Sequence, residues 1–518
     1  MSGKQRTAAE LGVPEQFNAA AWFIDRHISE GRATKVAIEC GDEHVTYGEL
    51  AERVNRCGNA LRDACGVERG DRVMLLLHDG PAFFYAFFGA IAVGAVPIPV
   101  NTLWKTADYR YVLADSGARV LIVSDALRPS VEAIPRAETP ELRHVIVDSS
   151  GGTFDRLIAE ARPTSGAAQT RHDSPAFWLY SSGSTGSPKG CVHLHHDMVV
   201  CATLFGIGIL GIRESDRCFS VPKLFFAYGL GNAGYFPLAV GATSILWPGP
   251  PAAADVYAVI ERHRPTLFFF VPTGYGMMLA RDGDFDLSSI RLASSAGEAL
   301  PPALYARFKA RFGIDILDGI GSTEVLHTFI SNRPGAIRAG SSGHLVDGYE
   351  ASLLNDEGQP VAAGDLGNLY IRGDSICDGY WNQPEKTRQT FKDGWISTGD
   401  KYRQDADGFY WYGGRADDML KVGGLWVSPI EVERVLMDHE AILECAVIGR
   451  TDADNLVKPM AFVVLREGFT GTSPLAAAIQ AFVRSRLAEY KRPRWVEFLD
   501  NLPKTPTGKV QRFKLRAR

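Results

Sequence analysis

Apolar residues in the first part of the chain follow two patterns, one typical of strands and one typical of helices. Short runs rich in Val, Leu and Ile predict buried strands at residues 71–77, 118–124 and 143–148. Residues 45–65 instead carry apolar side chains at helical spacing, and Thr46 with Glu49 forms a capping-box pattern where that helix would begin. Because strands alternate with helices, we expect parallel sheets covered by helices, which is an α/β fold.

One uncharged stretch, at residues 83–100, is close to the minimum length for a membrane span. Gly89, Gly94, Pro97 and Pro99 divide it into an aromatic helical part and a short extended part. A buried helix followed by a strand fits this pattern better than a span does. We therefore expect a soluble protein without a membrane partner.

Further strand-like runs lead into loops at residues 176–180, 266–271, 292–298 and 314–323. Residues 351–412 are typical of short strands separated by turns, whereas the sequence past Gly414 is mixed α/β with several basic residues. We predict a large domain of residues 1–415, with parallel-rich sheets and a β-rich subdomain. A small α+β domain of residues 416–518 would follow it.

The composition argues against several classes of function. A formal net charge of −5 and a pI near 6.2 disfavour nucleic acid as a partner. The eight cysteines contain no Cys-x-x-Cys pair, so neither a zinc site nor a disulfide framework is indicated. Reduced thiols fit a cytoplasmic protein, and residues 1–16 lack the apolar core of a signal peptide.

Residues 181–190 combine glycines, hydroxyl side chains and one lysine. Glycines let backbone N–H groups turn toward one point, hydroxyls add donors and Lys189 adds a positive charge, which suits a polyanion such as the triphosphate of ATP. This is not a Walker P-loop, because Gly190 follows Lys189 and the glycine spacing differs. A flexible surface turn is the alternative. The candidate binding residues are Ser181, Ser182, Gly183, Ser184, Thr185, Gly186 and Lys189.

This loop and several later stretches resemble, in the same order, motifs of the adenylate-forming superfamily of acyl-CoA synthetases, luciferases and peptide-synthetase adenylation domains. The matching stretches are residues 180–190, 295–301, 321–324, 397–400, 414–418 and 503–509. Residues 13–18 and 324–327 resemble benzoate–CoA ligases within that superfamily. The resemblance implies an ATP-dependent aryl-CoA ligase that forms an aryl adenylate and then a CoA thioester, using ATP, Mg²⁺ and coenzyme A.

The resemblance also implies roles toward the nucleotide. Lys509 would bridge the carboxylate and the α-phosphate, and Glu324 would bind Mg²⁺ together with the Thr185 hydroxyl. Asp400 would bind the ribose hydroxyls, with Arg415 nearby. The other implied nucleotide contacts are Gly297, Glu298, Asp318, Gly319, Ile320 and Thr323. Without the resemblance, a solvated lysine and a surface Asp–Arg pair would be the simpler interpretations.

Residues 224–235 are aromatic and small, and a packed core helix is the default interpretation of such a stretch. By resemblance, however, this segment forms one wall of an acyl pocket. The implied pocket residues are Phe226, Ala227, Tyr228, Ala296, Gly321, His327 and Thr328. Ala227 stands where enzymes for α-amino acids carry an acidic residue, which argues against such a substrate. His327 either acts in catalysis by donating to the substrate carboxylate or packs structurally behind its loop, and both readings stay open.

Two chemical steps with different partners imply a domain movement in this family. The small, mobile domain would rotate about Asp417 after adenylation, so that Lys509 leaves before the thiol enters. Lys421 would face the active site and Lys491 the CoA phosphates. The pantetheine tunnel would be lined by Gly423, Gly424 and Trp426.

We therefore expect a cytoplasmic enzyme, a monomer or a homodimer, that acts on a small aromatic carboxylic acid, ATP and CoA. By resemblance the acid is benzoate or an amino- or hydroxy-substituted benzoate. The Thr328 hydroxyl favours the substituted acids, with 2-aminobenzoate a serious candidate. Two alternatives stay open: an enzyme that loads a carrier-protein thiol, and a catalytically silent binder of nucleotides or aryl acids. His193 and His195, two positions apart on a predicted strand, could share a metal, although structural or site-lining histidines are the more frequent outcome.

Overall fold

The structure, a computed structural model, describes residues 5–164, 166–181, 188–416, 418–422, 425–452, 456–487, 489–504 and 510–518, with only the backbone at positions 421, 425 and 426. The chain forms two compact units, one of Met1–Ala351 with Ile371–Ile396 and one of Ser352–Tyr370 with Ser397–Arg518. This division groups part of the β-rich segment with the C-terminal residues. The domain boundary at residue 415 stays a prediction.

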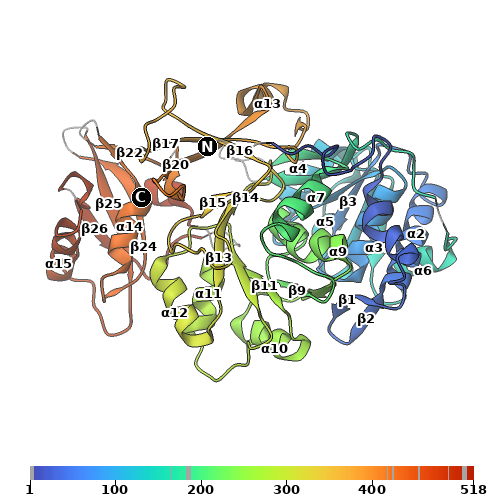
Figure 1. The fold of residues 1–518 in the computed structure, drawn as a ribbon, viewed down its shortest axis with the longest axis horizontal. Helices are drawn as coiled ribbons and strands as arrows, with labels where there is room; N and C mark the ends of the chain where they lie inside the picture. The colour runs from blue at the N-terminus through green and yellow to red at the C-terminus, as the bar shows by residue number, and fades with distance from the viewer. Residues whose placement is uncertain are drawn as a thin grey trace. The chain divides into compact units, whose positions relative to one another are not determined.

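The larger unit is built around a sheet in the order β15-β14-β13-β12-β11-β9-β10-β1-β2 (Figure 1). Its strands are β1 Val36–Cys40, β2 Glu43–Thr46, β9 Arg217–Ser220, β10 Thr243–Leu246, β11 Leu267–Phe270, β12 Leu292–Ser295, β13 Ile316–Gly321, β14 Thr328–Ser331 and β15 His344–Leu345. Pairs from β13 to β1 are parallel, and the outer strands β14, β15 and β2 pair antiparallel. Helices α10 (Ala253–His263), α11 (Pro272–Ala280) and α12 (Pro302–Phe312) bury the aromatic core beside β11. Continuous apolar strands are typical of a parallel sheet covered by helices.

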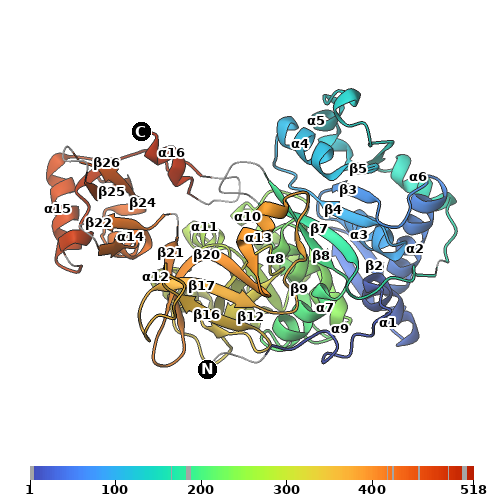
Figure 2. The same ribbon diagram turned by 90° about the horizontal axis from the view of Figure 1, so that it is seen from above.

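A second, parallel sheet has the order β4-β3-β5-β6. Its strands are β3 Arg72–Leu76, β4 Val96–Pro99, β5 Val120–Ser124 and β6 His144–Asp148. Helices α2 (Tyr47–Asp63) and α3 (Pro81–Ala92) pack against each other beside it (Figure 2). Gly89 permits this close approach, because an added Cβ would lie 2.9 Å from Cys57 Cβ. Thr46 closes the predicted capping box at the start of α2.

The uncharged stretch at residues 83–100 forms a buried helix and then strand β4, as predicted. Across the described ranges, no helix is both long and apolar enough to cross a membrane. The predicted strands at residues 71–77, 118–124 and 143–148 are β3, β5 and β6.

A third sheet has the order β18-β8-β7, with β7 Pro175–Ser181, β8 Lys189–Leu194 and β18 Gly379–Tyr380. β7 and β8 are antiparallel, so that Ser181 lies opposite Lys189. β18 pairs antiparallel with β8 and places Tyr380 opposite Cys191. This sheet therefore holds both ends of the predicted phosphate loop beside a segment that is remote in sequence.

The remaining helical segments of the larger unit are η1 Ala21–Asp25, α1 Arg26–Ser29, α4 Thr106–Ser116, η2 Asp125–Leu127, α5 Arg128–Glu132, η3 Arg136–Glu138, α6 Thr153–Glu160, α7 Asp197–Cys201, η4 Ala202–Ile207, α8 Ala227–Gly229, η5 Leu230–Tyr235, α9 Phe236–Val240 and α13 Pro384–Thr390. The helix expected within residues 224–235 begins at Ala227 and continues as the π-helix η5. Such π-helical turns are frequent at functional sites.

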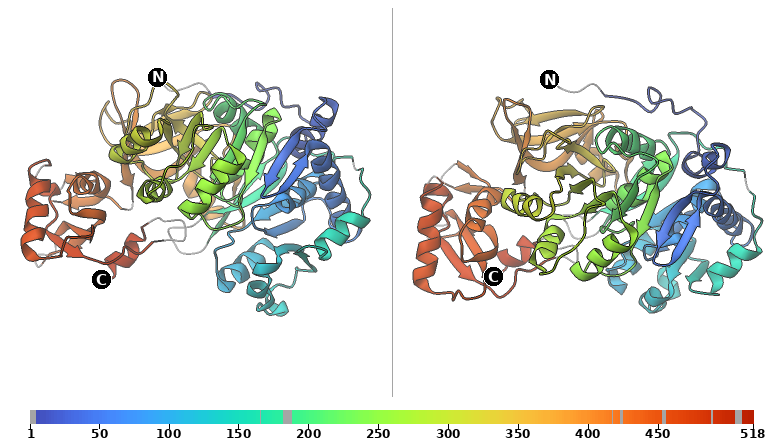
Figure 3. Two further views of the ribbon diagram at one scale, coloured as in Figure 1. Left: turned by 90° about the horizontal axis from the view of Figure 1, so that it is seen from below. Right: turned by 60° about the horizontal axis from the view of Figure 1, so that its bottom comes forward.

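The β-rich segment forms a sheet in the order β16-β17-β20-β19, with β21 beside β20. Its strands are β16 Glu350–Leu354, β17 Gly367–Arg372, β19 Phe391–Lys392, β20 Trp395–Gln404 and β21 Tyr410–Arg415. The C-terminal residues form the sheet β24-β25-β26 and the hairpin β22-β23, with α14 and α15 packed around a shared core (orange to red in Figure 3). These elements are β22 Leu420–Val422, β23 Leu425–Val427, α14 Pro429–Met437, β24 Ile442–Thr451, β25 Val457–Leu465, α15 Ser473–Arg484, η6 Glu489–Lys491, β26 Trp495–Phe498 and α16 Arg512–Arg516. The predicted fold class is confirmed.

Candidate active site

The two ends of the predicted phosphate loop are fixed to helix α4. Tyr180 Oη donates a hydrogen bond to Asp115 Oδ2 at 2.6 Å, and Tyr111 Oη donates to Pro188 O at 3.2 Å. Tyr111 and Asp115 are one helical turn apart, so a single face of α4 holds both strand ends. The predicted loop residues Ser182, Gly183, Ser184, Thr185 and Gly186 lie outside the described residues.

A cation, a phenol and a carboxylate converge beside this loop. Lys189 Nζ donates to Tyr380 Oη at 3.3 Å and lies 4.4 Å from the centroid of the Tyr380 ring. Tyr380 Oη donates in turn to Glu324 Oε1 at 2.9 Å, and Ser181 Oγ donates to the same oxygen at 3.4 Å. Burial and the Glu324 charge raise the pKa of Tyr380, so its phenol keeps the proton and stays a donor. Lysine and carboxylate groups at this spacing suit a metal-bound polyphosphate.

Tyr380 is not among the predicted site residues. It lies between two of the matching motifs, and the lysine that it contacts is 191 positions away in the chain. Only the pairing of β18 with β8 brings the two together. The aromatic run Tyr380-Trp381, set in a polar segment, is the signal that could have indicated it.

The predicted nucleotide contacts after β12 and on β13 lie at one edge of the main sheet, because Ser295 pairs in parallel with Asp318. Asp318 is buried, and its Oδ2 accepts a hydrogen bond from Leu300 N at 3.3 Å. Glu298 Oε2 accepts from the Thr273 hydroxyl at 2.8 Å, at the start of α11. The residues brought together here are Ala296, Gly297, Glu298, Asp318, Gly319 and Ile320.

Glycines on β13 allow β14 to approach closely. Gly321 lies opposite Thr328, and an added Cβ on Gly321 would lie 2.6 Å from His327 O. The buried Thr328 packs its methyl group against Gly319, where an added Cβ would lie 3.0 Å from Thr328 Cγ2. The predicted pocket residues at positions 321, 327 and 328 therefore lie together as one layer.

The segment predicted to form one wall of the acyl pocket begins helix α8. Ala227 is buried, whereas Phe226 and Tyr228 are partly exposed. Tyr228 Oη donates to Ser294 Oγ on β12 at 3.2 Å. The wall carries no charged side chain, as the sequence requires.

His327 lies among aromatic rings and is 2% exposed. Its ring centroid is 5.2 Å from Phe205, 5.5 Å from Tyr228 and 4.5 Å from Phe236. Nε2 forms a hydrogen bond with Tyr228 O at 3.3 Å, and since a carbonyl only accepts, Nε2 carries the proton. Burial lowers the pKa of His327 to about 3, against the raising effect of that hydrogen bond, so the imidazole is neutral near pH 7.

Nδ1 of His327 is then an acceptor with no hydrogen-bond partner in the described part of the chain. This packing fits the interpretation of His327 as a structural residue behind its loop. A contact between His327 and the substrate carboxylate stays a prediction. Gly231 of η5 makes the packing possible, because an added Cβ there would lie 2.3 Å from His327 Cδ2.

Asp400 and Arg415, predicted to contact the ribose, are paired on β20 and β21. Arg415 Nη1 donates to Asp400 Oδ1 at 3.4 Å and to Thr398 O at 3.1 Å. Lys491 Nζ donates to the Glu431 carboxylate at 2.6 and 2.7 Å. The predicted residues Asp417, Gly423, Gly424 and Lys509, and the side chains of Lys421 and Trp426, lie outside the described residues.

His193 and His195 do not share a ligand. His195 Nδ1 accepts a hydrogen bond from Ala19 N at 3.1 Å, whereas His193 forms a hydrogen bond with Asp197. Burial lowers the pKa of His195 to about 3. Within the ranges that the structure covers, no group of three or more His, Cys, Asp and Glu residues could hold a metal ion.

Comparison with known proteins places this geometry in a family. Residues 25–381 match the AMP-binding enzyme family, and residues 431–509 match the AMP-binding enzyme C-terminal domain. The chain is 49% identical over 519 residues to benzoate–CoA ligase of Thauera aromatica, covering 99% of this chain and 98% of that protein. It is 34% identical over 480 residues to anthranilate–CoA ligase of Pseudomonas aeruginosa, covering 91% of each.

Solved structures agree with these relatives. The crystal structure of the anthranilate CoA ligase AuaEII in complex with anthranoyl-AMP matches with a TM-score of 0.94 and 46% identity, covering 99% of this chain and 98% of that chain. The structure of a benzoate CoA ligase from Burkholderia xenovorans LB400 matches with a TM-score of 0.89 and 47% identity, covering 96% and 100%. The predicted resemblance to benzoate–CoA ligases is confirmed. The chain belongs to the AMP-binding enzyme family of adenylate-forming acid–thiol ligases.

Proposed function

We propose that this enzyme joins benzoate or 2-aminobenzoate to coenzyme A, with ATP converted to AMP and pyrophosphate. The observation that carries the substrate class is the uncharged wall of Ala227 and Tyr228 beside the neutral, ring-enclosed His327. Aromatic and apolar side chains with few polar groups suit a flat aromatic acid and offer no partner for an ammonium group. Relatives whose names specify benzoate and anthranilate match the chain over nearly its whole length.

The reaction has two steps. A carboxylate oxygen of the acid forms a bond to the α-phosphorus of ATP while the bond from that phosphorus to pyrophosphate breaks. The CoA sulfur, after loss of its proton, then attacks the acyl carbon, and AMP leaves with the electron pair of the acyl–oxygen bond. Because AMP is a far better leaving group than oxide, ATP cleavage makes the thioester accessible.

Charge on the phosphates is the main demand of the first step. We assign Lys189 and the hydroxyls of the loop that precedes it to the departing pyrophosphate, and Lys509 to the bridge between the carboxylate and the α-phosphate. Tyr380 holds Lys189 and the Glu324 carboxylate in one group, which supports this assignment. Asp400 and Arg415 would bind the ribose.

The residues present fit Mg²⁺ at Glu324. Its Oε1 accepts hydrogen bonds from Tyr380 and Ser181, whereas Oε2 accepts none from the residues that the structure describes. An oriented carboxylate with an oxygen to spare is a usual ligand for a hard cation. Mg²⁺ bound there would neutralise charge on the phosphate oxygens, and Thr185 would add a hydroxyl.

A substituent on the ring would meet two polar atoms. The Nδ1 acceptor of His327 lacks a partner among the described residues, and the buried Thr328 carries a hydroxyl. An amino or hydroxyl group can donate to such an acceptor, and a pocket hydrogen bond discriminates more strongly than an added methylene does. This supports 2-aminobenzoate as a substrate beside benzoate.

The second step would follow rotation of the C-terminal domain about Asp417, which withdraws Lys509. Lys421 would then face the active site and Lys491 the CoA phosphates. The pantetheine tunnel would be lined by Gly423, Gly424 and Trp426. We further propose a cytoplasmic monomer or homodimer. A second candidate acceptor, a carrier-protein thiol, is tested by comparing thioester formation with free CoA and with a carrier protein.

A substrate panel tests the proposal. AMP release is measured with benzoate, 2-amino-, hydroxy- and halobenzoates, cinnamate and a fatty acid, for the wild type and for Thr328→Val and Thr328→Ile. We expect benzoate and 2-aminobenzoate to have the highest kcat/KM of the panel in the wild type. Both variants should lower the kcat/KM ratio of 2-aminobenzoate to benzoate, because the hydroxyl is lost. Ratios that do not change would remove Thr328 from selectivity, and a fatty acid leading the panel would overturn the substrate class.

A further inference from the structure

We propose that His193 and Asp197 form a buried pair that positions the loop carrying Glu324, and that the pair acts on the adenylation step through that loop. Neither residue belongs to the predicted site. The inference rests on the proposed function, because it assigns the loop a task in the first half-reaction.

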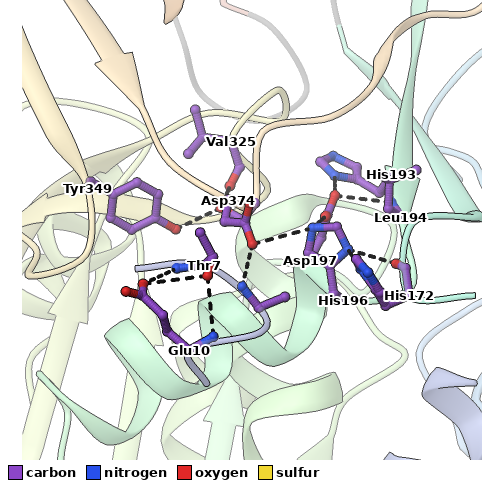
Figure 4. A network of polar contacts seen from close by, with 12 residues as sticks. Thr7, Glu10, His172, His193, Leu194, His196, Asp197, Val325, Tyr349 and Asp374 are labelled. Atoms are coloured by element: carbon purple, nitrogen blue, oxygen red, sulfur yellow. Dashed lines mark hydrogen bonds and ion pairs between the residues drawn. The ribbon is translucent and has the colours of Figure 1, made fainter. Parts of the chain in front are cut away.

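The pair contacts the loop directly. His193 Nδ1 lies 2.7 Å from Asp197 Oδ2, and both side chains are inaccessible to solvent. His193 Nε2 lies 2.8 Å from the backbone oxygen of Thr323, the residue before Glu324. Figure 4 shows His193 and Asp197 in the polar network, together with Val325 of the same loop.

Hydrogen-bond roles fix the protons of the pair. Thr323 O only accepts, so His193 Nε2 carries a proton. Asp197 Oδ2 already accepts from Leu194 N at 3.1 Å, and its short contact with Nδ1 requires one more proton between imidazole and carboxylate. On whichever of the two atoms that proton lies, both ring nitrogens of His193 are hydrogen-bonded, and the orientation of the ring is fixed.

The polar network extends from Asp197 through His196 and Asp374 to the N-terminal segment. His196 Nε2 lies 3.4 Å from Asp197 Oδ1 and 3.8 Å from Asp374 Oδ2. Asp374 Oδ2 accepts a hydrogen bond from Ala8 N at 2.5 Å. Asp197 thus lies between two histidine rings, and its buried Oδ1 forms no hydrogen bond within the described residues.

The three backbone carbonyls before Leu326, those of residues 323–325, each accept a hydrogen bond from outside the loop. Thr323 O meets His193, Glu324 O accepts from Cys377 N at 2.8 Å, and Val325 O accepts from Ser375 Oγ at 2.9 Å. Leu326 then has φ of 69°, a conformation that a leucine adopts only where the surroundings impose it. Strain held by several hydrogen bonds indicates a loop whose exact path matters for its side chains.

Two variants, each of which keeps a polar atom at the position of one ring nitrogen, separate positioning from simple packing. In His193→Gln the side-chain amide nitrogen replaces Nε2 and keeps the donor to Thr323 O, but the contact with Asp197 is lost. In His193→Asn the amide nitrogen replaces Nδ1, which keeps the contact with Asp197 but removes the imidazole donor to Thr323 O. Among the described residues, Leu326 N at 3.1 Å is then the donor that remains to that oxygen. His195→Asn, the same change two positions along, is the matched control, because asparagine can still accept from Ala19 N.

Asp197→Asn supplies an independent test. If its oxygen accepts from Leu194 N and from His193 Nδ1, Nε2 loses its proton and faces Thr323 O with a lone pair. If the amide nitrogen instead occupies the position of Oδ2, its N–H groups face the Leu194 N–H, and that hydrogen bond is lost. Either arrangement loses one hydrogen bond, although the shape of the side chain is preserved.

The experiment compares the two half-reactions in each protein. ATP–pyrophosphate exchange with benzoate reports adenylation, and CoA thioester formation from synthetic benzoyl adenylate reports the second step and correct folding. The shift of the melting temperature on addition of Mg²⁺ and ATP reports nucleotide binding without turnover. We expect His193→Asn and Asp197→Asn to lower the exchange rate about 10- to 100-fold and to reduce the melting shift, with the second step retained.

His193→Gln should retain more exchange activity than His193→Asn, and His195→Asn should match the wild type. Equal losses in both half-reactions, or a His193→Gln variant worse than His193→Asn, would overturn the inference in favour of a purely structural pair. A wild type that shows no exchange with any aryl acid would instead refute the proposed function, so the two failures are distinguishable.

Discussion

At the scale of single residues, the Tyr380 phenol joins the candidate cation and the candidate metal ligand. Replacing it by phenylalanine keeps the ring beside Lys189 but removes the donor to Glu324 Oε1. A hydrogen bond to a charged group contributes about 1.5–3 kcal/mol, so we expect Tyr380→Phe to slow adenylation at least tenfold. ATP–pyrophosphate exchange measures this.

A matched control is Tyr257→Phe, which removes a buried phenol that donates to Met278 O at 2.8 Å in the core of the larger unit. That variant should lose stability without a specific loss of adenylation. If Tyr380→Phe exchanges pyrophosphate at the wild-type rate, the phenol has no part in orienting Glu324.

Gly231 is the second residue whose change reaches the site. An alanine Cβ would lie 2.3 Å from His327 Cδ2 and 2.6 Å from Nε2. Because the neighbouring aromatic rings enclose His327, we expect Gly231→Ala to displace the imidazole and to destabilise the protein by about 1–3 kcal/mol. kcat/KM for benzoate and 2-aminobenzoate should fall together with the melting temperature.

Gly276→Ala on α11 is the control for that change, because an added Cβ there meets nothing within 4 Å. It should be neutral or slightly stabilising, since alanine has the better helix propensity. A Gly231→Ala variant with unaltered kinetics and stability would show that the His327 imidazole can move away from the added methyl group without a measurable cost.

At the scale of elements, helix α2 owes its start to a local device that the sequence already shows. The Thr46 hydroxyl accepts from Glu49 N, and the Glu49 carboxylate accepts from Thr46 N. We expect Thr46→Ala to cost about 1 kcal/mol, with Thr46→Ser close to wild type. The kinetic constants should not change, because α2 does not contribute a predicted site residue.

The check is thermal unfolding of the three proteins under one buffer condition, with ATP–pyrophosphate exchange as the second readout. Loss of activity at temperatures well below unfolding would contradict the purely local role of this cap. Equal melting temperatures for all three would show that tertiary packing, and not the cap, sets where α2 begins.

At the scale of the whole molecule, buried neutral histidines make stability depend on pH. Burial lowers the pKa of His195 to about 3, whereas an unfolded histidine titrates near pH 6.5. Between these values the unfolded chain binds the extra proton, so this group's contribution is present above pH 6.5 and is lost as the pH falls. At pH 5 the wild type should have lost about 2 kcal/mol through His195.

His195→Asn removes that titration and leaves the others in place. The difference in melting temperature between wild type and variant should therefore shift in favour of the variant as the pH is lowered from 7 to 5. Comparing the two proteins cancels the opposing effect of Asp25 and Asp79, whose pKa values burial raises to about 6. A difference that stays constant with pH would mean that His195 takes up its proton over the same pH range in the folded and the unfolded protein.

Much of the fold was predictable because its signals are local. The apolar runs that form β3, β5 and β6, the capping box of α2 and the helix-then-strand division of residues 83–100 all depend on neighbours in sequence. The candidate site residues on β13 were predictable only through the resemblance of whole motifs. Their roles toward ATP and CoA stay proposals.

What the sequence by itself determined is therefore the alternation of strands and helices, the uncharged segment around Ala227 and the loop of glycines and hydroxyls before Lys189. Only the tertiary structure decided that Tyr380 reaches Lys189 and that His193 holds Thr323 O, contacts that span 191 and 130 positions. The tertiary structure also made His327 neutral. Periodicity and capping act over a few residues, whereas pKa shifts and long-range hydrogen bonds depend on which strands pair and on what excludes water.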